Sequence, residues 1–66
     1  MKVHYDPAAD ALYFRIDETP VVESEEVRPG VILDLDSRDN VVGIELLRVS
    51  ERTNVDNLRE ISLRVA

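Results

Sequence analysis

Apolar and polar residues alternate in several short runs along the chain, which is the pattern of half-buried β-strands. Val3 and Tyr5 share one side of the first run, and Leu12, Phe14 and Ile16 share one side of the second. The pattern predicts a mainly β (α+β) fold, with an antiparallel sheet of four to five short strands built from hairpins and a short C-terminal helical turn. The expected strands cover residues 2–5, 11–16, 21–28, 31–36 and 41–48.

Turn-forming residues mark the places where the chain reverses. Residues 6–10 are expected to form a helix-like turn, in which aspartate side chains accept hydrogen bonds from nearby backbone N–H groups. Pro29 followed by Gly30 predicts a tight turn, because proline sets φ near about −65° and glycine permits a positive φ. Residues 37–40 have the composition of a hairpin loop. Gly43 inside a strand predicts a bulge or a close approach by another backbone.

The end of the chain fits two patterns. Thr53 or Asn54 can cap a short helix over residues 55–59, and the alternation that follows predicts a last strand over residues 61–65. A single helix over residues 54–65 is the competing interpretation, because apolar residues in this stretch also share one helical face. We favour the short helix followed by a strand, and we expect the whole chain, residues 1–66, to form one small β-rich domain.

A single sheet in a chain of 66 residues leaves apolar surface that the chain itself hardly covers. The C-terminal segment is the one candidate cover within the chain. No cysteine is present, so neither a disulfide nor a thiolate zinc site can stabilise the fold. We therefore expect a homo-oligomer, in which a second copy packs sheet on sheet or completes the sheet at an edge. The second face of the sheet is also rich in large side chains: Tyr13, Ile32, Val41 and Leu47.

Fourteen acidic residues against eight basic ones give the chain a net charge of −6. This balance disfavours direct nucleic-acid binding, which uses clustered Lys and Arg, and it suits a small basic protein partner. The strand over residues 21–28 is mostly polar and is expected at a solvated edge of the sheet. We expect no membrane segment and a cytoplasmic protein, because no apolar run approaches a membrane span and the N-terminus has no signal-peptide core. The candidate interaction residues are Tyr13, Glu23, Glu25, Glu26 and Glu45.

The chain lacks the usual catalytic and metal-binding patterns. His4 is the one histidine, and no serine stands in a nucleophile elbow. The acids that follow residue 33 depart from the calcium-loop pattern, since Arg38 occupies a ligand position and Asp39 stands where the glycine belongs. We therefore expect no catalytic residue, no metal and no cofactor, and we do not expect an enzyme.

Glu45 stands between two apolar residues of a strand, where an unpaired buried carboxylate would be costly. We expect it to pair electrostatically with Arg15 or Arg48 across a strand or subunit boundary. One alternative of a different class remains open. In it, Asp6, Asp10 and Glu45 serve a small ligand- or metal-binding protein or a minimal hydrolase.

Three segments, residues 5–13, 30–34 and 41–47, together resemble the signature of the Domain of Unknown Function 2283 family. Their order and spacing match over residues 1–50. The resemblance implies a small uncharacterised prokaryotic protein with no established activity. Genes of this family can lie beside small basic toxin-like proteins, so the resemblance also implies a non-catalytic interaction module, antitoxin-like towards a small basic protein.

Overall fold

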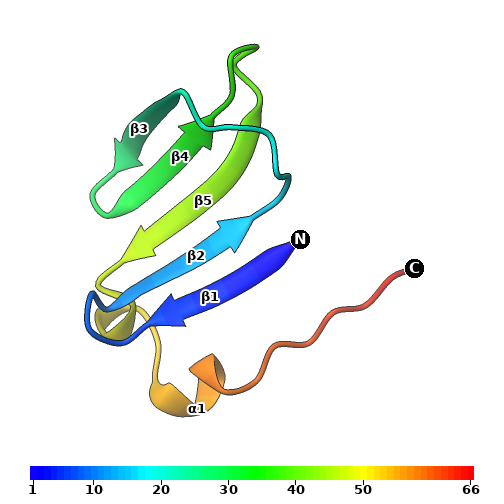
Figure 1. The fold of residues 1–66 in the computed structure, drawn as a ribbon. Coiled ribbons are helices and arrows are strands. Elements are labelled where there is room, and N and C mark those ends of the chain that lie inside the picture. The colour runs from blue at the N-terminus through cyan, green and yellow to red at the C-terminus, as the bar shows by residue number, and fades with distance from the viewer.

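The computed structural model describes all 66 residues and contains one sheet of five antiparallel strands (Figure 1). The strand order is β1-β2-β5-β4-β3, so β1 and β3 form the two edges. The predicted fold class, an antiparallel sheet with a short helical turn near the C-terminus, is confirmed. The elements are β1 (Lys2–Asp6), β2 (Ala11–Arg15), β3 (Glu23–Arg28), β4 (Val31–Leu35), β5 (Val41–Leu47), the 3₁₀ turn η1 (Val49–Glu51) and α1 (Val55–Leu58).

Strand β5 is the last strand in the sequence, but it lies in the middle of the sheet and joins its two halves. β1 and β2 form one hairpin, β3 and β4 form another, and β5 pairs with β2 on one side and β4 on the other. The segment between β2 and β3 crosses the end of the sheet, where Ile16 and Asp17 donate backbone hydrogen bonds to Val42 and Val22 donates one to Leu35. A long crossover of this kind puts β3 at the edge opposite β1.

The predicted turns form through local hydrogen bonds. Asp6 Oδ1 accepts hydrogen bonds from the backbone N–H groups of Ala8 (3.0 Å) and Ala9 (3.4 Å), so its capping role is confirmed. Asp36 Oδ1 does the same for the loop before β5, accepting from two backbone N–H groups at 2.8 and 2.9 Å. Gly30 has a φ of 75°, which glycine adopts without strain.

A bulge lies beside Gly43, as the sequence predicts. The register of β4 against β5 shifts between Asp34, which pairs with Gly43, and Leu35, which pairs with Val41. Other side chains rather than another backbone approach Gly43 closely. A Cβ there would stand 2.8 Å from the Tyr13 hydroxyl and 3.1 Å from an Asp34 carboxylate oxygen.

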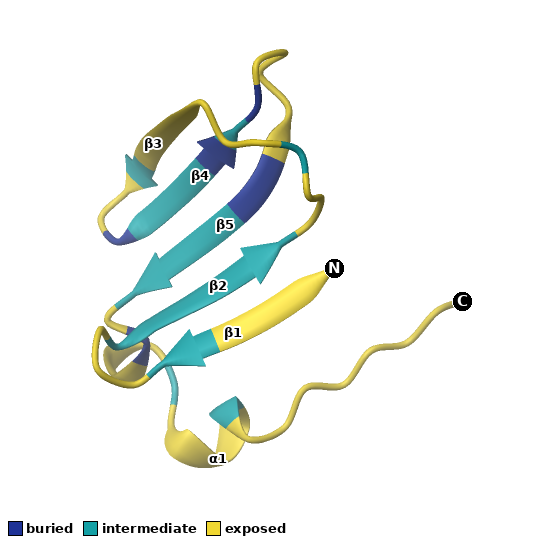
Figure 2. Cartoon of the chain, in the orientation of Figure 1, coloured by how far each residue is buried: buried dark blue, intermediate teal, exposed yellow.

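The register divides the sheet into two faces, because directly paired residues of antiparallel strands point to the same side. We call one side the apolar face; a row of paired residues crosses it from Val3 through Phe14 and Ile44 to Leu33. We call the other side the polar face; its rows include His4, Tyr13 and Glu45, and also Arg15, Gly43 and Asp34. Val42 and Val49 are the two buried hydrophobic residues, and most of the sheet is only half-buried (Figure 2). No second layer of the chain covers the apolar face.

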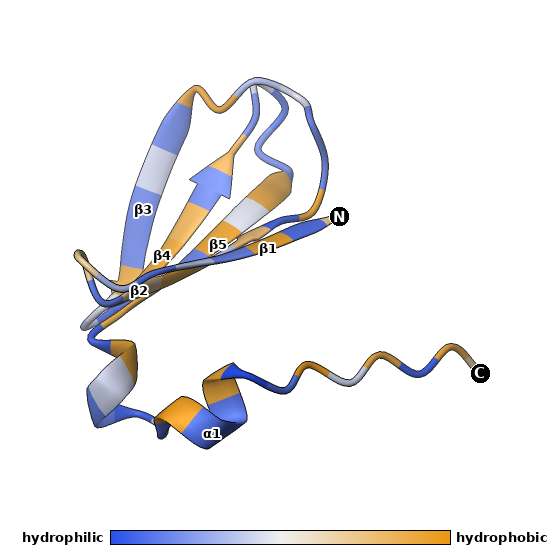
Figure 3. Cartoon of the chain, turned by 60° about the horizontal axis from the view of Figure 1, so that its bottom comes forward, coloured by the Kyte–Doolittle hydropathy of each residue, from blue (hydrophilic) through white to orange (hydrophobic).

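The C-terminal segment follows one of the two predicted patterns only in part. The short helix α1 is confirmed, and Asn54 caps it by accepting a hydrogen bond from the Asn57 backbone N–H at 2.9 Å. The single helix over residues 54–65 is wrong, since the helix ends at Leu58. The strand over residues 61–65 is also wrong, because this stretch is extended but pairs with no strand. A strand needs a neighbour for its backbone groups, and within one chain the tail (residues 60–66) reaches none (Figure 3).

Candidate functional site

The centre of the polar face carries a cluster of polar side chains from four strands. Asp34 is only 3% exposed, and its Oδ1 accepts a hydrogen bond of 2.6 Å from the Ser24 hydroxyl. Tyr13 lies over Gly43, and Arg15 Nη1 donates a 3.4 Å hydrogen bond to its hydroxyl. Arg15 also donates to the backbone carbonyl of Thr19 at 2.5 Å. Glycine at position 43 therefore makes the room in which these side chains meet.

Glu45 faces Asp34 rather than a base. Partial burial raises the pKa of Glu45 first, and a hydrogen bond and charge repulsion from Asp34 raise it further. Within the chain Glu45 pairs with neither predicted partner, because Arg15 bonds Tyr13 and Thr19 while Arg48 lies 3.9 Å from Glu51. Because its pKa is raised, Glu45 holds its proton to a higher pH than an ordinary glutamate does, which lessens the repulsion between the two acids on neighbouring strands.

The geometry of this cluster is that of a structural hydrogen-bond network rather than that of a small-ligand site. No group of three His, Cys, Asp or Glu side chains in the structure is arranged to hold a metal ion, and no pocket indents the surface. Every buried side-chain nitrogen or oxygen has a hydrogen-bond partner. A site for a small ligand needs a concave surface with polar groups directed into it. Tyr13 and Glu45, two of the candidate interaction residues, belong to this cluster.

Asp6, Asp10 and Glu45 do not come together. Asp6 lies at the end of edge strand β1 and caps its own turn, whereas Glu45 lies two strands away, near Asp34. Asp10 follows that turn with a φ of 51° and binds Ser50. These three carboxylates therefore form no common catalytic or metal-binding centre.

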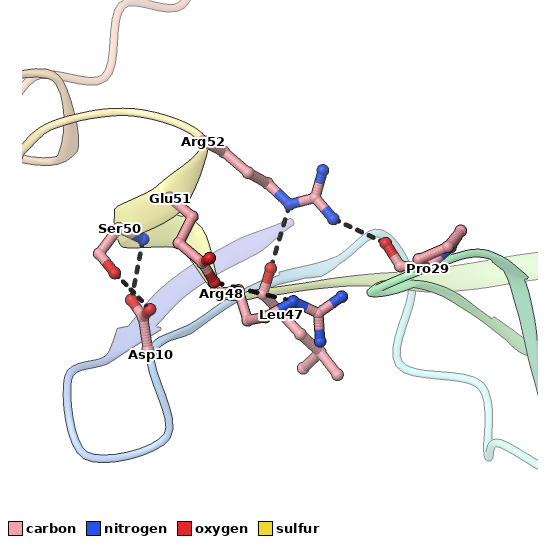
Figure 4. Close-up of polar contacts among 7 residues, drawn as sticks. All are labelled: Asp10, Pro29, Leu47, Arg48, Ser50, Glu51 and Arg52. Atoms are coloured by element: carbon pink, nitrogen blue, oxygen red, sulfur yellow. Dashed lines mark hydrogen bonds and ion pairs between the residues drawn. The ribbon is translucent and has the colours of Figure 1, made fainter.

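A second polar cluster joins the end of the sheet to the C-terminal segment (Figure 4). We call it the clasp, and it consists of Asp10, Pro29, Leu47, Arg48, Ser50, Glu51 and Arg52. Asp10 accepts hydrogen bonds from both the backbone N–H (3.0 Å) and the hydroxyl (2.6 Å) of Ser50. These bonds, above all the one from the hydroxyl, lower the pKa of Asp10. Tyr5 donates a further hydrogen bond to Asp10 at 3.1 Å. The loop between β1 and β2 thus caps η1, although forty residues separate the partners.

The arginines of the clasp hold the turn between β3 and β4. Arg52 donates to the carbonyl oxygens of Leu47 (3.0 Å) and Pro29 (2.8 Å). Arg48, with a φ of 53°, turns the chain out of β5 and places its guanidinium close to Gly30. A Cβ on Gly30 would meet the Arg48 and Arg52 guanidinium groups at 2.6 and 2.8 Å. The clasp therefore sets where α1 and the tail leave the sheet.

The acidic residues of β3 lie at an edge of the sheet, as expected. Glu23, Glu25 and Glu26 are all exposed, and β3 pairs only with β4. Glu23 and Glu25 flank Leu35 and Leu33 on the apolar side, while Glu26 flanks Ile32 on the other. We call these three residues the acidic edge. Its main-chain groups and its charge are both available to a partner.

Asp34 and Ser50 are structurally important residues whose contacts the sequence did not predict. Asp34 could be recognised only from its register against Gly43, the one strand position without a side chain. Ser50 lies in η1, outside the strands, and no pattern of neighbouring residues reveals its contact with Asp10, forty residues earlier in the sequence. Both depend on which strands become neighbours.

The model of the protein family of unknown function DUF2283 matches residues 2–50, and the chain belongs to that family. The match covers the whole sheet and ends within η1. No curated protein and no solved structure matches the chain. None of the helices has the length and apolar character that crossing a bilayer requires.

Proposed function

We propose that this chain is a non-catalytic protein-interaction domain that works as a homo-oligomer, in which a second copy covers the apolar face. The observation behind it is a sheet with a continuous apolar row and no second layer in its own chain. Domains are stable when two layers of secondary structure enclose a core. A second copy supplies the layer that this chain lacks.

The exposed area agrees with a missing partner. The chain exposes 5192 Å², whereas a compact monomer of its mass exposes about 4,200 Å². The excess, about 1,000 Å², is comparable to the roughly 800 Å² that each partner contributes to a standard interface. The extended tail contributes part of this excess area. The uncovered apolar face is the reason that only two hydrophobic residues, Val42 and Val49, are buried.

Light scattering across a concentration series tests the proposal. We expect the wild-type chain to give a mass of at least two chains at micromolar concentration. Leu33→Lys, which places a charge on the apolar face, should shift the chain to monomer. Ile32→Lys is the matched control: it changes the neighbouring residue, which faces Glu45 and Glu26 on the other side, and should leave the mass unchanged.

A second measurement keeps the proposal testable if Leu33→Lys does not fold. The thermal midpoint of an oligomer rises with protein concentration, while that of a monomer does not. We expect the wild-type midpoint to rise. A wild-type chain that scatters as a 7.5 kDa species at high concentration, with a constant midpoint, would overturn the proposal.

We further propose that the acidic edge recruits a small basic protein. An edge strand offers main-chain hydrogen bonds to an added strand, and exposed carboxylates steer a basic partner towards it. Replacing Glu23, Glu25 and Glu26 with Gln should slow association with the small basic protein of any adjacent gene several-fold at low salt. The two rates should converge near molar salt, since exposed charges are screened. Equal rates at every ionic strength would mean that these acids serve only to protect the edge.

A further inference from the structure

The tail contains a five-residue segment that is complementary to edge strand β1. We propose that residues 60–64 of one copy add to β1 of a second copy as a sixth, parallel strand. This inference rests on the proposed function, because it names a contact through which two copies associate. Its basis is a free strand, a free edge and a matching order of charged and apolar residues.

The tail is a strand without a partner. Ile61, Leu63 and Val65 alternate along it and are 65%, 84% and 86% exposed. The last backbone hydrogen bond of the chain is donated by Glu60, at the end of α1. Large apolar side chains and unpaired backbone groups therefore both stand in solvent at the same place.

The sheet offers two edges, and its side chains favour β1. On the apolar face, β1 presents Val3 and Tyr5, which would continue into the apolar side of an added tail. On the same face, the other edge presents Glu23 and Glu25, whose carboxylates would lose water beside that apolar side. Charged residues at an edge discourage pairing with such a strand. The acidic edge is therefore left to basic partners.

Charge sets the direction of the added strand. Strand β1 reads from a basic residue, Lys2, to an acidic one, Asp6, with Val3, His4 and Tyr5 between them. The tail segment has the opposite polarity, from Glu60 to Arg64, with Ile61, Ser62 and Leu63 between them.

A parallel alignment places Glu60 beside Lys2 and Arg64 beside Asp6. It also places Ile61 beside Val3 and Leu63 beside Tyr5 on one face. An antiparallel alignment in the same register opposes like charges at both ends, which is unfavourable. Lys2 now pairs with Glu18 at 3.1 Å, but both side chains are exposed, so this ion pair exchanges at little cost.

The direction of the chain explains why the partner is a second copy. Within one chain the tail runs opposite to β1 (Figures 1 and 3). The clasp fixes where α1 begins, so the tail of the same chain approaches β1 in the antiparallel sense that brings like charges together. A second copy can dock in the parallel sense. Each copy has one free tail and one β1 edge, so a pair can exchange tails reciprocally, as a closed two-fold dimer requires.

Disulfide trapping tests the contact directly, because the chain contains no cysteine of its own. A His4→Cys copy is mixed with a Ser62→Cys copy under mild oxidation, and the products are separated by mass. We expect a mixed disulfide-linked dimer, since these exposed residues lie side by side in the parallel alignment. The control mixes Ser62→Cys with Glu26→Cys on the acidic edge. No mixed dimer, or equal yields in both mixtures, would overturn the inference.

A charge exchange tests the direction. In the full-length chain we expect Lys2→Glu alone, and Glu60→Lys alone, to weaken dimerisation about two- to five-fold at low salt. The double variant should return to the wild-type dissociation constant. Stronger dimerisation of Lys2→Glu would place position 2 beside Arg64, in the antiparallel alignment, and would overturn the parallel pairing.

Failure of this inference and failure of the proposed function give different results. A wild-type oligomer that yields no His4–Ser62 cross-link refutes the exchanged tail and leaves the covered apolar face intact. A wild-type monomer by light scattering refutes both.

Discussion

The two faces of the sheet contain side chains from the same strands, yet only one of them is complete within a single chain. On the polar face, Asp34 is nearly fully buried and has partners in Ser24 and Glu45. On the apolar face, the row through Phe14, Ile44 and Leu33 has no layer above it and is only half-buried.

The difference follows from the kind of interaction that each face needs. A hydrogen bond is short and directional, so a neighbouring strand in the same layer can satisfy a polar side chain. Apolar side chains gain from the area they remove from water, and a flat layer has no means of covering its own surface. A single sheet can therefore complete its polar face alone but needs a second layer for its apolar face.

The largest effect is expected from Phe14→Ala on the apolar face. If a second copy covers this face, removal of the ring should cost about 3 kcal/mol of unfolding free energy in a concentrated sample. The loss should shrink on dilution, because the dissociated chain leaves the ring half-exposed. Urea unfolding at two protein concentrations measures both values; a loss that is independent of concentration would mean that no second layer forms.

Gly43→Val should damage the polar face by about 2 to 3 kcal/mol, because the added side chain overlaps Tyr13 and Asp34. Gly30→Ala is the milder comparison and should cost about 1 kcal/mol, since it strains a positive φ but meets only the flexible ends of two arginines. Urea unfolding of both variants decides the order. Equal or reversed losses would contradict the close packing around Gly43.

Ser24→Ala should cost about 1 kcal/mol, because it removes a hydrogen bond from the buried Asp34 carboxylate. Ser37→Ala, in the exposed loop before β5, is the matched control and should have no measurable effect. Thermal unfolding at one protein concentration compares them. If both variants match the wild type, water replaces the Ser24 hydroxyl and the polar face is less closed than its burial indicates.

The smallest effects on stability are expected from changes in pH. The raised pKa of Glu45 means that its contribution to stability is present below its unfolded pKa and is lost as the pH rises through the folded pKa. Glu45→Gln, which resembles the protonated acid, should therefore raise the urea midpoint at pH 7 and have little effect near pH 3.

The pKa of Asp10 is lowered, so its contribution to stability has the opposite pH dependence. Its contribution is present above its unfolded pKa and is lost as the pH falls through the folded pKa. Asp10→Asn should therefore lower the midpoint at pH 7 and change it less in acid. Urea midpoints of the two variants across this pH range should diverge in opposite directions from the wild type; parallel curves would refute the assigned environments.

Much of the fold could be predicted from local pattern. Alternation identified all five strands, with ends displaced by one or two residues, and the turn at residues 6–10 formed around Asp6 as expected. Gly43 indicated the bulge in the same way. These features depend on interactions between residues close in the sequence, which a pattern of residue types reveals.

The candidate site was less predictable, and Glu45 illustrates why. Its position between apolar residues showed that it needed a partner, but within the chain neither Arg15 nor Arg48 pairs with it, and Asp34 of the neighbouring strand is the group that acts on it. The choice depended on β5 lying between β2 and β4 in a particular register. The acidic edge was placed correctly because a strand rich in glutamate fits only where water reaches it.

The sequence by itself determined the strands, the turns, the acidic edge and the shortage of core, because each follows from the order of residue types along a few neighbouring positions. Only the tertiary structure decided which strands pair, that Asp10 caps η1 forty residues away, and that the tail stays outside the sheet. Alternation in Ile61, Leu63 and Val65 specifies a strand, but a strand forms only where an edge is within reach. Reach depends on the path of the chain through the clasp, which no local pattern contains.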